Sequence, residues 1–445
     1  MQLITSVAES SKITIDKNTF DTVNGTTLAI ASVTGAGSQL TVNECNLTNF
    51  EATGNIKLID SGTSAITMAM HTAQIANIKS GDTLYVANGY MTTATVSGCT
   101  LSNLEGNVMV FNGHEDSTEF NITNTSVSGI TGLGTGAVTS IVGVNGKAIG
   151  ATTLTLKNIT NVRTLTLMKA KDAIQVDGLK TEQLSATIVN MLSAATISIA
   201  NSNFNNYDEI VCVQSLTFAD AGSTGSISMS DSQVGNMTCS PATATIKLLE
   251  GQDVSVSGSE IKNITGAVGV IAAASQAQTV VLQKSQISNI AKVSKLISGG
   301  ADSLHMSEVT ISDLSISSAA SIIELQSHNN TITSSTFKSI SGDVDYHLFG
   351  LSLPAQSSEI SSSTTTMSGL VFETITGNGA STAVKMIVLS HASSASQTHA
   401  HNVDIQNCST TATGAVISYS DSDAASVNLP LSLVVKDSVV PHAML

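Results

Sequence analysis

Short segments in which apolar and polar residues alternate recur along most of the chain. In "LTVNE", "ATVSG", "ISMSD" and "VSVSG", the first and third residues are apolar and the second and fourth are Ser, Thr or Asn. Such alternation places the apolar side chains on one face of a β-strand and the polar side chains on the other. No amphipathic segment of helical length separates these stretches. The pattern therefore predicts an all-β chain whose strands each have one buried face.

A second motif follows most of these segments. It has a small residue, an apolar residue two positions later that we call the anchor, and another apolar residue three positions beyond the anchor. Successive spacings are 27, 28, 26 and 26 residues over the first five anchors, and 30, 27, 26, 24 and 26 from the seventh to the twelfth. The 45 residues between the sixth and the seventh leave room for one poorly matching coil around Leu179. The thirteen anchors are Phe20, Leu47, Ile75, Leu101, Val127, Ile159, Phe204, Val234, Ile261, Ile287, Ile311, Phe337 and Phe372.

Two columns of residues follow from this alignment. Two positions before the anchor the residue is usually small, for example Cys45, Cys99 or Ser259, which predicts a tightly packed corner. Two positions after the anchor the residue is most often Asn. Asn tolerates the left-handed backbone of a sharp bend. Coils that stack at about 4.8 Å would place these amides above one another as a hydrogen-bonded asparagine ladder. The predicted ladder residues are Asn49, Asn77, Asn103, Asn161, Asn206, Asn236, Asn263 and Asn289.

A period of about 26 residues indicates stacked supersecondary units rather than separate globular domains. Two or three short strands per period predict a right-handed, single-stranded parallel β-helix of roughly 14–16 coils. We expect a single domain over residues 1–445. It would have an N-terminal cap or edge at 1–12, regular coils over 13–340, coils with longer loop insertions over 341–420, and a C-terminal strand or cap over 421–445.

The corner motif, the asparagine column and the rung length resemble the right-handed parallel β-helix proteins of the pectin-lyase-like superfamily. The resemblance extends from Ile13 to Ser420. The repeats are also similar to those of adhesins and polymorphic outer-membrane proteins, although the Gly-Gly-Ala-Ile phrase of the latter is missing. The resemblance implies the fold. It leaves function open, because the superfamily includes lyases, hydrolases, tailspikes, adhesins and structural proteins.

The resemblance also indicates which catalytic motifs an enzyme of this superfamily would carry. Its hydrolases have Asn-Thr-Asp, Asp-Asp, Gly-His-Gly and Arg-Ile-Lys stretches, and none of these occurs here. Its lyases use a basic residue with calcium-binding carboxylates, whereas Arg163 is the single arginine and has no cluster of Asp around it. Carboxylates from different coils can still converge in space. The sequence therefore favours a non-enzymatic protein over an enzyme and assigns no catalytic residue.

Composition restricts the partners. Charged residues make up 11% of the chain and the net charge is −15, so the clustered Lys and Arg of a nucleic-acid-binding surface are absent. With no Trp and 5 Tyr, carbohydrate binding by aromatic stacking is disfavoured. The least charged run, residues 264–283, is diluted by Gln, Ser, Thr and Gly and is not expected to span a membrane. The first residues lack the basic and apolar segments of a signal peptide.

The five cysteines are widely spaced and contain no Cys-x-x-Cys pair, so we expect neither a disulfide framework nor a zinc site. Cys45 and Cys99 fall in the small-residue column two coils apart. Their separation of about 10 Å by strand spacing is too long for a disulfide. We interpret both as buried small residues.

Two polar groups are candidate binding sites. Asp343, Asp345 and His347 alternate in "DVDYH" and would share one face of an extended segment, unless the segment is a solvated loop. His399 and His401 alternate in "THAHNVD", where two imidazoles can bind a metal weakly but no third ligand is assured. We predict ligand binding for these five residues and assign no metal or cofactor to the chain.

These observations favour a structural or adhesive β-helix on a cell surface or in an extracellular assembly. Its expected partners are glycans or other surface proteins, and further copies of the chain that stack end to end or laterally. Recognition would belong to the coil insertions around residues 341–371 and 376–404. The alternative is a polysaccharide lyase or glycoside hydrolase with a dispersed site on the β-helix face.

Overall fold

The structure is a computed structural model. It describes residues 2–6, 8–114, 119–133, 136–144, 147–204, 210–240, 244–273, 279–298, 303–317, 321–325, 329–353, 362–378, 384–391, 400–406, 409–410, 415–420 and 431–436. Most of the described residues belong to strands, and none of them belongs to a helix. The described strand pairings are parallel and form a β-solenoid with about 26 residues per turn, which confirms the predicted fold class.

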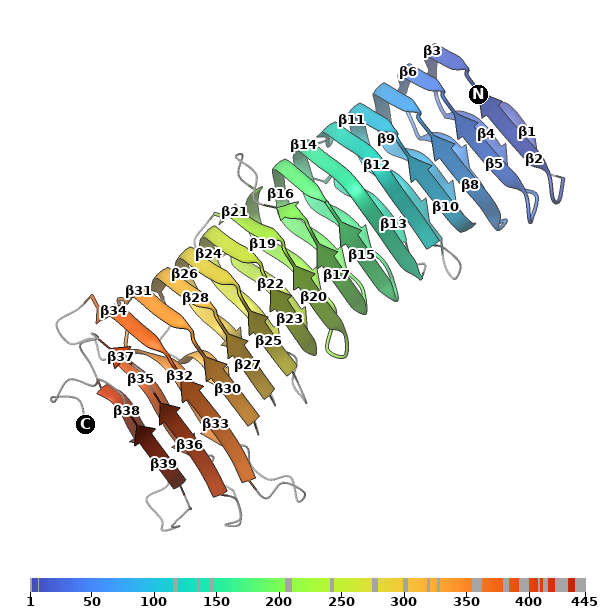
Figure 1. Cartoon of the computed structure of the whole chain (residues 1–445). Helices are drawn as coiled ribbons and strands as arrows, with labels where there is room; N and C mark the ends of the chain where they lie inside the picture. Colours follow the sequence, from blue (N-terminus) through green and yellow to red (C-terminus); the bar gives the residue numbers. More distant parts are fainter. Residues whose placement is uncertain are drawn as a thin grey trace. The chain divides into compact units, whose positions relative to one another are not determined.

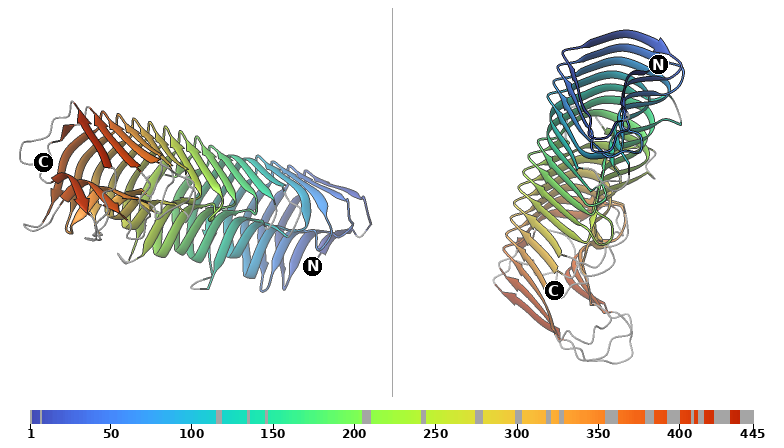
Figure 2. Two further views of the ribbon diagram at one scale, coloured as in Figure 1. Left: turned by 90° about the horizontal axis from the view of Figure 1, so that it is seen from below. Right: turned by 90° about the vertical axis from the view of Figure 1, so that its right-hand side faces the viewer.

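The chain divides into two compact units. Unit 1 comprises Met1–Asp220 and Asn236–Ser240, and unit 2 comprises Ala221–Gly235 and Pro241–Leu445. In each unit every turn supplies strands to three rows of parallel strands, and the strands of one row run side by side (Figures 1 and 2). The expectation of one continuous domain stays a prediction.

Row 1 holds the alternating segments of the sequence, with eight strands or strand segments in each unit. In unit 1 these are β2 (Lys12–Asp16), β5 (Gln39–Asn43), β8 (Ile66–His71), β10 (Met91–Ser97), the first part of β12 (Glu119–Thr131), the first part of β14 (Ala148–Lys169), β15 (Ala173–Asp177) and β17 (Thr196–Ala200). In unit 2 they are β20 (Ser226–Ser230), β23 (Asp253–Ser257), β25 (Thr279–Gln283), β27 (Ser303–Ser307), β30 (Asn329–Thr333), β33 (Ser362–Ser368), β36 (Ala400–Gln406) and β39 (Leu431–Lys436).

Row 2 holds the anchors. Its strands are β3 (Thr19–Gly25), β6 (Asn46–Ala52), the first parts of β9 (Gln74–Gly89) and β11 (Thr100–Gly113), the later part of β12, the middle of β14, the first part of β16 (Lys180–Ser193), β18 (Asn203–Phe204), β21 (Gln233–Cys239), the first parts of β24 (Glu260–Ala273) and β26 (Gln286–Ser298), β28 (Thr310–Ile316), β31 (Thr336–Gly342), β34 (Val371–Gly377) and β37 (Ser409–Thr410).

Row 3 closes each turn. It consists of the ends of the long strands β9, β11, β14, β16, β24 and β26, together with β1 (Gln2–Ser6), β4 (Leu28–Val33), β7 (Ile56–Asp60), β13 (Val138–Val144), β19 (Ile210–Asp220), β22 (Thr245–Gly251), β29 (Ser321–Leu325), β32 (Tyr346–Leu353), β35 (Val384–His391) and β38 (Ala415–Ser420).

The core of each unit lies inside the three rows and is built from stacked apolar columns. Ile15, Val42, Met70 and Val96 face one another in successive turns of row 1, and each is at least 96% buried. The residues on either side of each such residue point outward, as strand alternation requires, and all of them are polar except Ala69 beside Met70. A turn buries its apolar face only against adjacent turns, so stability accumulates along the stack.

Each turn bends at corners with a left-handed backbone. The corner that follows the anchor has φ between 49° and 66° in every described turn, which confirms the predicted bend. Asn, Gly and Asp adopt this conformation at little cost, whereas Thr, Gln and Ser do so at a penalty. The residues at this corner are Thr22, Asn49, Asn77, Asn103, Gly129, Asn158, Gln183, Asn236, Asn263, Asn289, Asp313, Ser339 and Thr374.

Candidate functional site

The predicted asparagine ladder is present in unit 1, and all of its hydrogen bonds point the same way along the stack. Asn103 Nδ2 donates to Asn77 Oδ1 at 2.9 Å, and Asn77 Nδ2 donates to Asn49 Oδ1 at 3.0 Å. Asn49 Nδ2 in turn donates to Asp21 Oδ1 at 2.7 Å. Every amide therefore donates toward the N-terminal turn, and the ladder ends on a carboxylate, which only accepts. Gly129 ends it at the other side, because glycine has no side-chain amide to donate to Asn103 Oδ1; a Cβ at this position would lie 2.8 Å from that oxygen.

Asp21 accepts a second hydrogen bond, from Thr48 Oγ1 at 2.7 Å. This bond, followed by the one from Asn49, lowers the pKa of the Asp21 carboxyl below its ordinary value of 3.8. Both bonds favour the ionised form, because a carboxylate is the stronger acceptor. Asp21 therefore terminates the ladder as an anion over the neutral range.

One predicted ladder residue stands in a different column. The register pairs Leu101 with Val127 and Val127 with Leu156, so the anchor of this turn is Leu156 rather than Ile159. Asn158, with φ 55°, therefore occupies the ladder column, and the assignment of Asn161 to it is wrong. Asn161 stands at the next corner, and its amide donates to Gly132 O at 2.9 Å. The error arises because "LKNITNV" contains two overlapping matches to the anchor motif.

The remaining predicted ladder residues lie in the later turns. Asn289 Nδ2 donates to Asn263 Oδ1 at 2.7 Å, with the same polarity as in unit 1. Asn236 has the expected left-handed backbone, with φ 49°. Asn206 lies outside the described residues. The predicted coil around Leu179 is present, with Gln183 at its corner and φ 51°.

A second polar column, at the small residues before the anchor, is buried. Ser259 Oγ donates to Ser257 O at 2.8 Å and accepts the backbone N–H of Ser232 at 3.2 Å. Cys45 and Cys99 occupy the same position in earlier turns, and Cys45 Sγ contacts Asn43 O at 3.2 Å. Burial raises the pKa of the Cys99 thiol. This column satisfies backbone groups at a corner that water does not reach, which explains the preference for small residues there.

Asp–Asn pairs with the same polarity occur at four further places, and the sequence patterns did not reveal them. In each case an Asn amide donates to an Asp carboxylate in the preceding turn. The pairs are Asn43 with Asp16 at 2.6 Å, Asn88 with Asp60 at 2.9 Å, Asn201 with Asp177 at 2.9 Å and Asn378 with Asp343 at 2.8 Å. These pairs could have been found in the sequence, because each Asp is followed by an Asn about one turn later.

The candidate group in "DVDYH" lies where the chain passes from β31 to β32. Asp343 and Asp345 are exposed and His347 is half-buried. Tyr346 between them points inward, is fully buried, and shares its hydroxyl proton between Ile340 O and Thr376 O, each at 3.1 Å. Burial raises the pKa of Tyr346 well above its usual range. Asp345 and His347, on either side of Tyr346, therefore lie on the outer side. Asp343 lies in a bend before β32, so the expected shared face of three residues is present for two of them.

The second candidate group is described only in part. His399 lies outside the described residues. His401 belongs to β36, where its backbone pairs with Ser363 and Leu431. Within the described part of the chain no cluster of three or more His, Cys, Asp or Glu side chains could hold a metal ion. Ligand binding by Asp343, Asp345, His347, His399 and His401 stays a prediction.

The outer face of row 1 in unit 2 is a regular surface of short hydroxyl side chains. The three outward positions on β20, β23, β25, β27, β30 and β33 make eighteen positions, of which thirteen are Ser or Thr. Asp253 is the single carboxylate among them. In-register pairing arranges these side chains in three columns, for example Ser228, Ser255, Val281, His305, Thr331 and Thr366 in the middle column. We call these eighteen positions the hydroxyl face.

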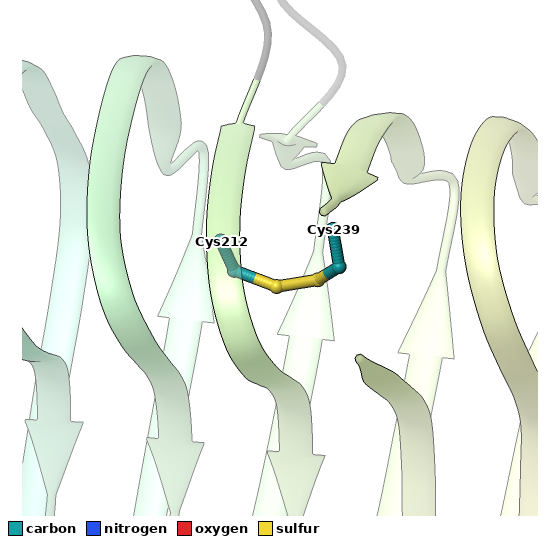
Figure 3. The surroundings of a disulfide bond; sticks show 2 residues. All are labelled: Cys212 and Cys239. Carbon is teal, nitrogen blue, oxygen red and sulfur yellow. A yellow bond between two sulfur atoms is a disulfide. The ribbon is translucent and has the colours of Figure 1, made fainter. Parts of the chain in front are cut away.

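Cys212 and Cys239 form a disulfide, so the expectation that the cysteines would not pair is wrong (Figure 3). Cys212 lies near the start of β19 and Cys239 at the end of β21, and the two are register partners. Their sequence separation of 27 residues is one turn, which places the Cα atoms 4.5 Å apart, within the range for a disulfide. Cys45 and Cys99 are buried and free.

No protein-family model, curated protein or solved structure matches the chain. None of the described segments is a helix with the length and apolar character needed to cross a membrane.

Proposed function

We propose that this chain is a non-enzymatic structural or adhesive protein of a cell surface or extracellular assembly, with a β-helix of the pectin-lyase-like type. The hydroxyl face is the observation that carries the proposal. It is long, almost uncharged and repeated at every turn, whereas a catalytic centre needs a few convergent groups at one place.

The chemistry of this face suits a repetitive polar ligand. A hydroxyl both donates and accepts hydrogen bonds, so it can pair with glycan hydroxyls or with backbone amides of another protein. The parallel sheet holds the hydroxyls in fixed columns, which reduces the entropy lost when the ligand binds. Many weak bonds along one face then add up through multivalency. Glycans and surface proteins are therefore the proposed partners.

The disulfide supports an extracellular location. Disulfides persist in oxidising compartments and are rare where thiol reductants are abundant. Further recognition is proposed for the segments around 341–371 and 376–404, where Asp343 and Asp345 are exposed.

Co-sedimentation with insoluble cellulose, chitin and calcium pectate, together with static light scattering over a concentration series, tests this proposal. We expect the wild type to bind at least one polymer or to self-associate. The double variant Ser255→Lys with Thr331→Lys, on the hydroxyl face, should lose most of that property. The control variant Thr265→Lys with Gln286→Lys places the same charges on exposed positions of row 2 and should keep it. A monomeric wild type that binds none of the three polymers contradicts the proposal.

The enzymatic alternative is tested with the same material. Polyuronates and neutral glycans are incubated with the chain, with and without calcium, and new reducing ends or unsaturated products are measured. If the wild type shows turnover and the triple variant Asp343→Ala, Asp345→Ala, His347→Ala does not, the chain is a polysaccharide lyase or hydrolase and the structural assignment is wrong. We expect no turnover and unchanged binding in that variant.

A further inference from the structure

Residues 147–180 are a basic segment in an acidic chain. They contain six of the 18 Lys and Arg residues and two of the 33 Asp and Glu residues, so the segment has a net charge of +4 while the whole chain has −15. The segment is therefore an exception to the scattered cations of the rest of the chain. Its six cations are Lys147, Lys157, Arg163, Lys169, Lys171 and Lys180.

Three of these cations meet at one corner of the solenoid, where row 3 passes to row 1. Lys169 is the last residue of β14, and Lys171 follows it before β15 begins. Lys147 lies at the same corner of the preceding turn, because its carbonyl accepts the backbone N–H groups of Asp172 and Ala173 at 3.0 and 2.9 Å. We call Lys147, Lys169 and Lys171 the lysine corner.

The side chains of the lysine corner are exposed on a backbone that is held in place. Ala170 is buried, whereas Lys169 and Lys171 on either side of it are exposed, as is Lys147 in the preceding turn. Ala170 N donates to Ser193 O at 2.9 Å, and Ala195 N donates to Lys171 O at 3.2 Å. The corner is thus hydrogen-bonded to the turns on both sides, so its lysines start from fixed positions.

The three ammonium groups act together. Adjacent turns are separated by about 4.8 Å, and residues i and i+2 of an extended segment by about 6.6 Å. Both spacings are shorter than the screening length of about 8 Å at physiological salt. Asp172, which is exposed, is the one carboxylate in residues 143–147 and 169–172. The corner therefore keeps a net positive charge.

The lysine corner also differs from the rest of the described chain. In the other described turns of unit 1, this corner carries no Lys or Arg. Within the part of the chain that the structure describes, none of its three lysines forms an ion pair. Elsewhere lysines lie 2.5–3.6 Å from a carboxylate, and these are Lys57, Lys79, Lys247, Lys262 and Lys295. The lysine corner thus has charge available for a ligand.

The surface beside the lysine corner is uncharged and has short side chains. The outward residues of row 1 that follow the corner are Ala148, Gly150 and Thr152 on β14, and Ala173 and Gln175 on β15. Register pairs Ala148 with Ala173 and Gly150 with Gln175. A thin polymer can therefore lie close to the backbone here, and Thr152 and Gln175 offer hydrogen bonds to sugar hydroxyls.

We propose that the lysine corner binds an acidic glycan, through ion pairs between its three ammonium groups and sulfate or carboxylate groups of the polymer. This inference rests on the proposed function in taking a glycan as the partner, but it uses a surface of unit 1 that is separate from the hydroxyl face of unit 2. An acidic glycan has neutral sugar rings between its charges, which suits a small basic site. The unbroken row of phosphates of a nucleic acid would extend onto the acidic remainder of the chain.

Binding of the full chain to immobilised chondroitin sulfate, hyaluronate and neutral dextran tests the proposal. We expect binding to at least one of the two acidic polymers, no binding to dextran, and weaker binding when NaCl is raised from about 50 mM to about 200 mM. Binding to hyaluronate shows that carboxylates suffice, whereas binding confined to chondroitin sulfate shows that sulfate is required.

A pair of triple variants locates the site. Lys147→Gln, Lys169→Gln, Lys171→Gln should weaken binding about tenfold or more. The control Lys12→Gln, Lys284→Gln, Lys338→Gln removes the same charge from exposed positions in three separate turns and should bind like the wild type. Circular dichroism should show the wild-type melting temperature for both, since all six positions are exposed.

Three results would overturn the proposal. The first is a wild type that binds neither acidic polymer, and the second is an equal loss of binding in the two triple variants. The third is tighter binding to single-stranded DNA, or self-association that the Lys147 triple variant abolishes, because the partner would then be a nucleic acid or a second copy. Cellulose and chitin, which are neutral, report on the hydroxyl face, so a failure of the proposed function is seen separately.

Discussion

The side-chain amide of Asn77 donates a hydrogen bond of 3.0 Å to the side-chain oxygen Oδ1 of Asn49, which lies 28 residues earlier and in the preceding turn. Both residues have a left-handed backbone, with φ 56° and 57°. One side chain type thus performs two tasks at this corner, because Asn tolerates the bend and also links adjacent turns. The link continues to Asn103 on one side and to Asp21 on the other.

Replacing Asn77 separates these two tasks. Asn77→Gly removes the ladder bonds to Asn49 and Asn103 but keeps the backbone relaxed, and we expect a loss of about 1 kcal/mol because the site is exposed. Asn77→Ala adds the strain of a left-handed alanine, about 1–2 kcal/mol more. Thermal melting followed by circular dichroism measures both, since the chain has no Trp. Equal melting temperatures for the two variants would show that the left-handed backbone at residue 77 puts no strain on alanine.

Ser259 tests the buried column. Ser259→Ala removes the hydroxyl that accepts the N–H of Ser232 and donates to the carbonyl of Ser257, and we expect a cost of about 1–3 kcal/mol. The Ser257 carbonyl keeps its second hydrogen bond, from Asp231 N. Ser259→Cys should cost less, because Cys45 and Cys99 occupy the equivalent position and bond to the equivalent carbonyl. Urea denaturation gives the comparison. A Cys variant as unstable as the Ala variant would show that the hydrogen bonds of this column depend on oxygen.

The anchor Ile261 is 2% exposed and packs against Ile287 of the next turn. Ile261→Asp buries an unpaired charge, and we expect a loss of more than about 4 kcal/mol, or failure to fold. Thr265→Asp, on the exposed side of the same strand, is the control and should change the melting temperature little. An unchanged melting temperature for Ile261→Asp would show that the anchor faces solvent.

Tyr346 gives a pH-dependent prediction. Tyr346→Phe leaves Ile340 O and Thr376 O without this donor and should cost about 1–2 kcal/mol. Because burial raises the pKa of Tyr346 in the folded state, the unfolded chain ionises first. The contribution of Tyr346 is therefore complete below its ordinary pKa of 10.0 and is lost as the pH rises above that value. Melting temperatures of wild type and Tyr346→Phe should converge between pH 9 and pH 11; parallel curves would contradict this.

The sequence alone determined the strands, the period and the corners. Alternation of apolar and polar residues shows which side of a strand is buried, and a left-handed corner restricts the residue types that can occupy it. Both features can therefore be recognised from the local sequence. Asn49, Asn77, Asn103, Asn263 and Asn289 were placed correctly for this reason. Candidate ligands such as Asp343 and His347 were also identified by alternation, although their binding role stays a prediction.

Tertiary structure decided which residues become neighbours across turns. The register that makes Leu156 the anchor, and so moves the ladder from Asn161 to Asn158, depends on how adjacent turns pair, because both matches fit the local motif. The pairing of Cys212 with Cys239 depends on the same register, which brings residues 27 positions apart into contact. The hydroxyl face likewise emerges only when separate strands align. Local chemistry therefore specified each turn, whereas the contacts that join the turns required the stacked structure, since a one-residue shift in pairing changes every neighbour.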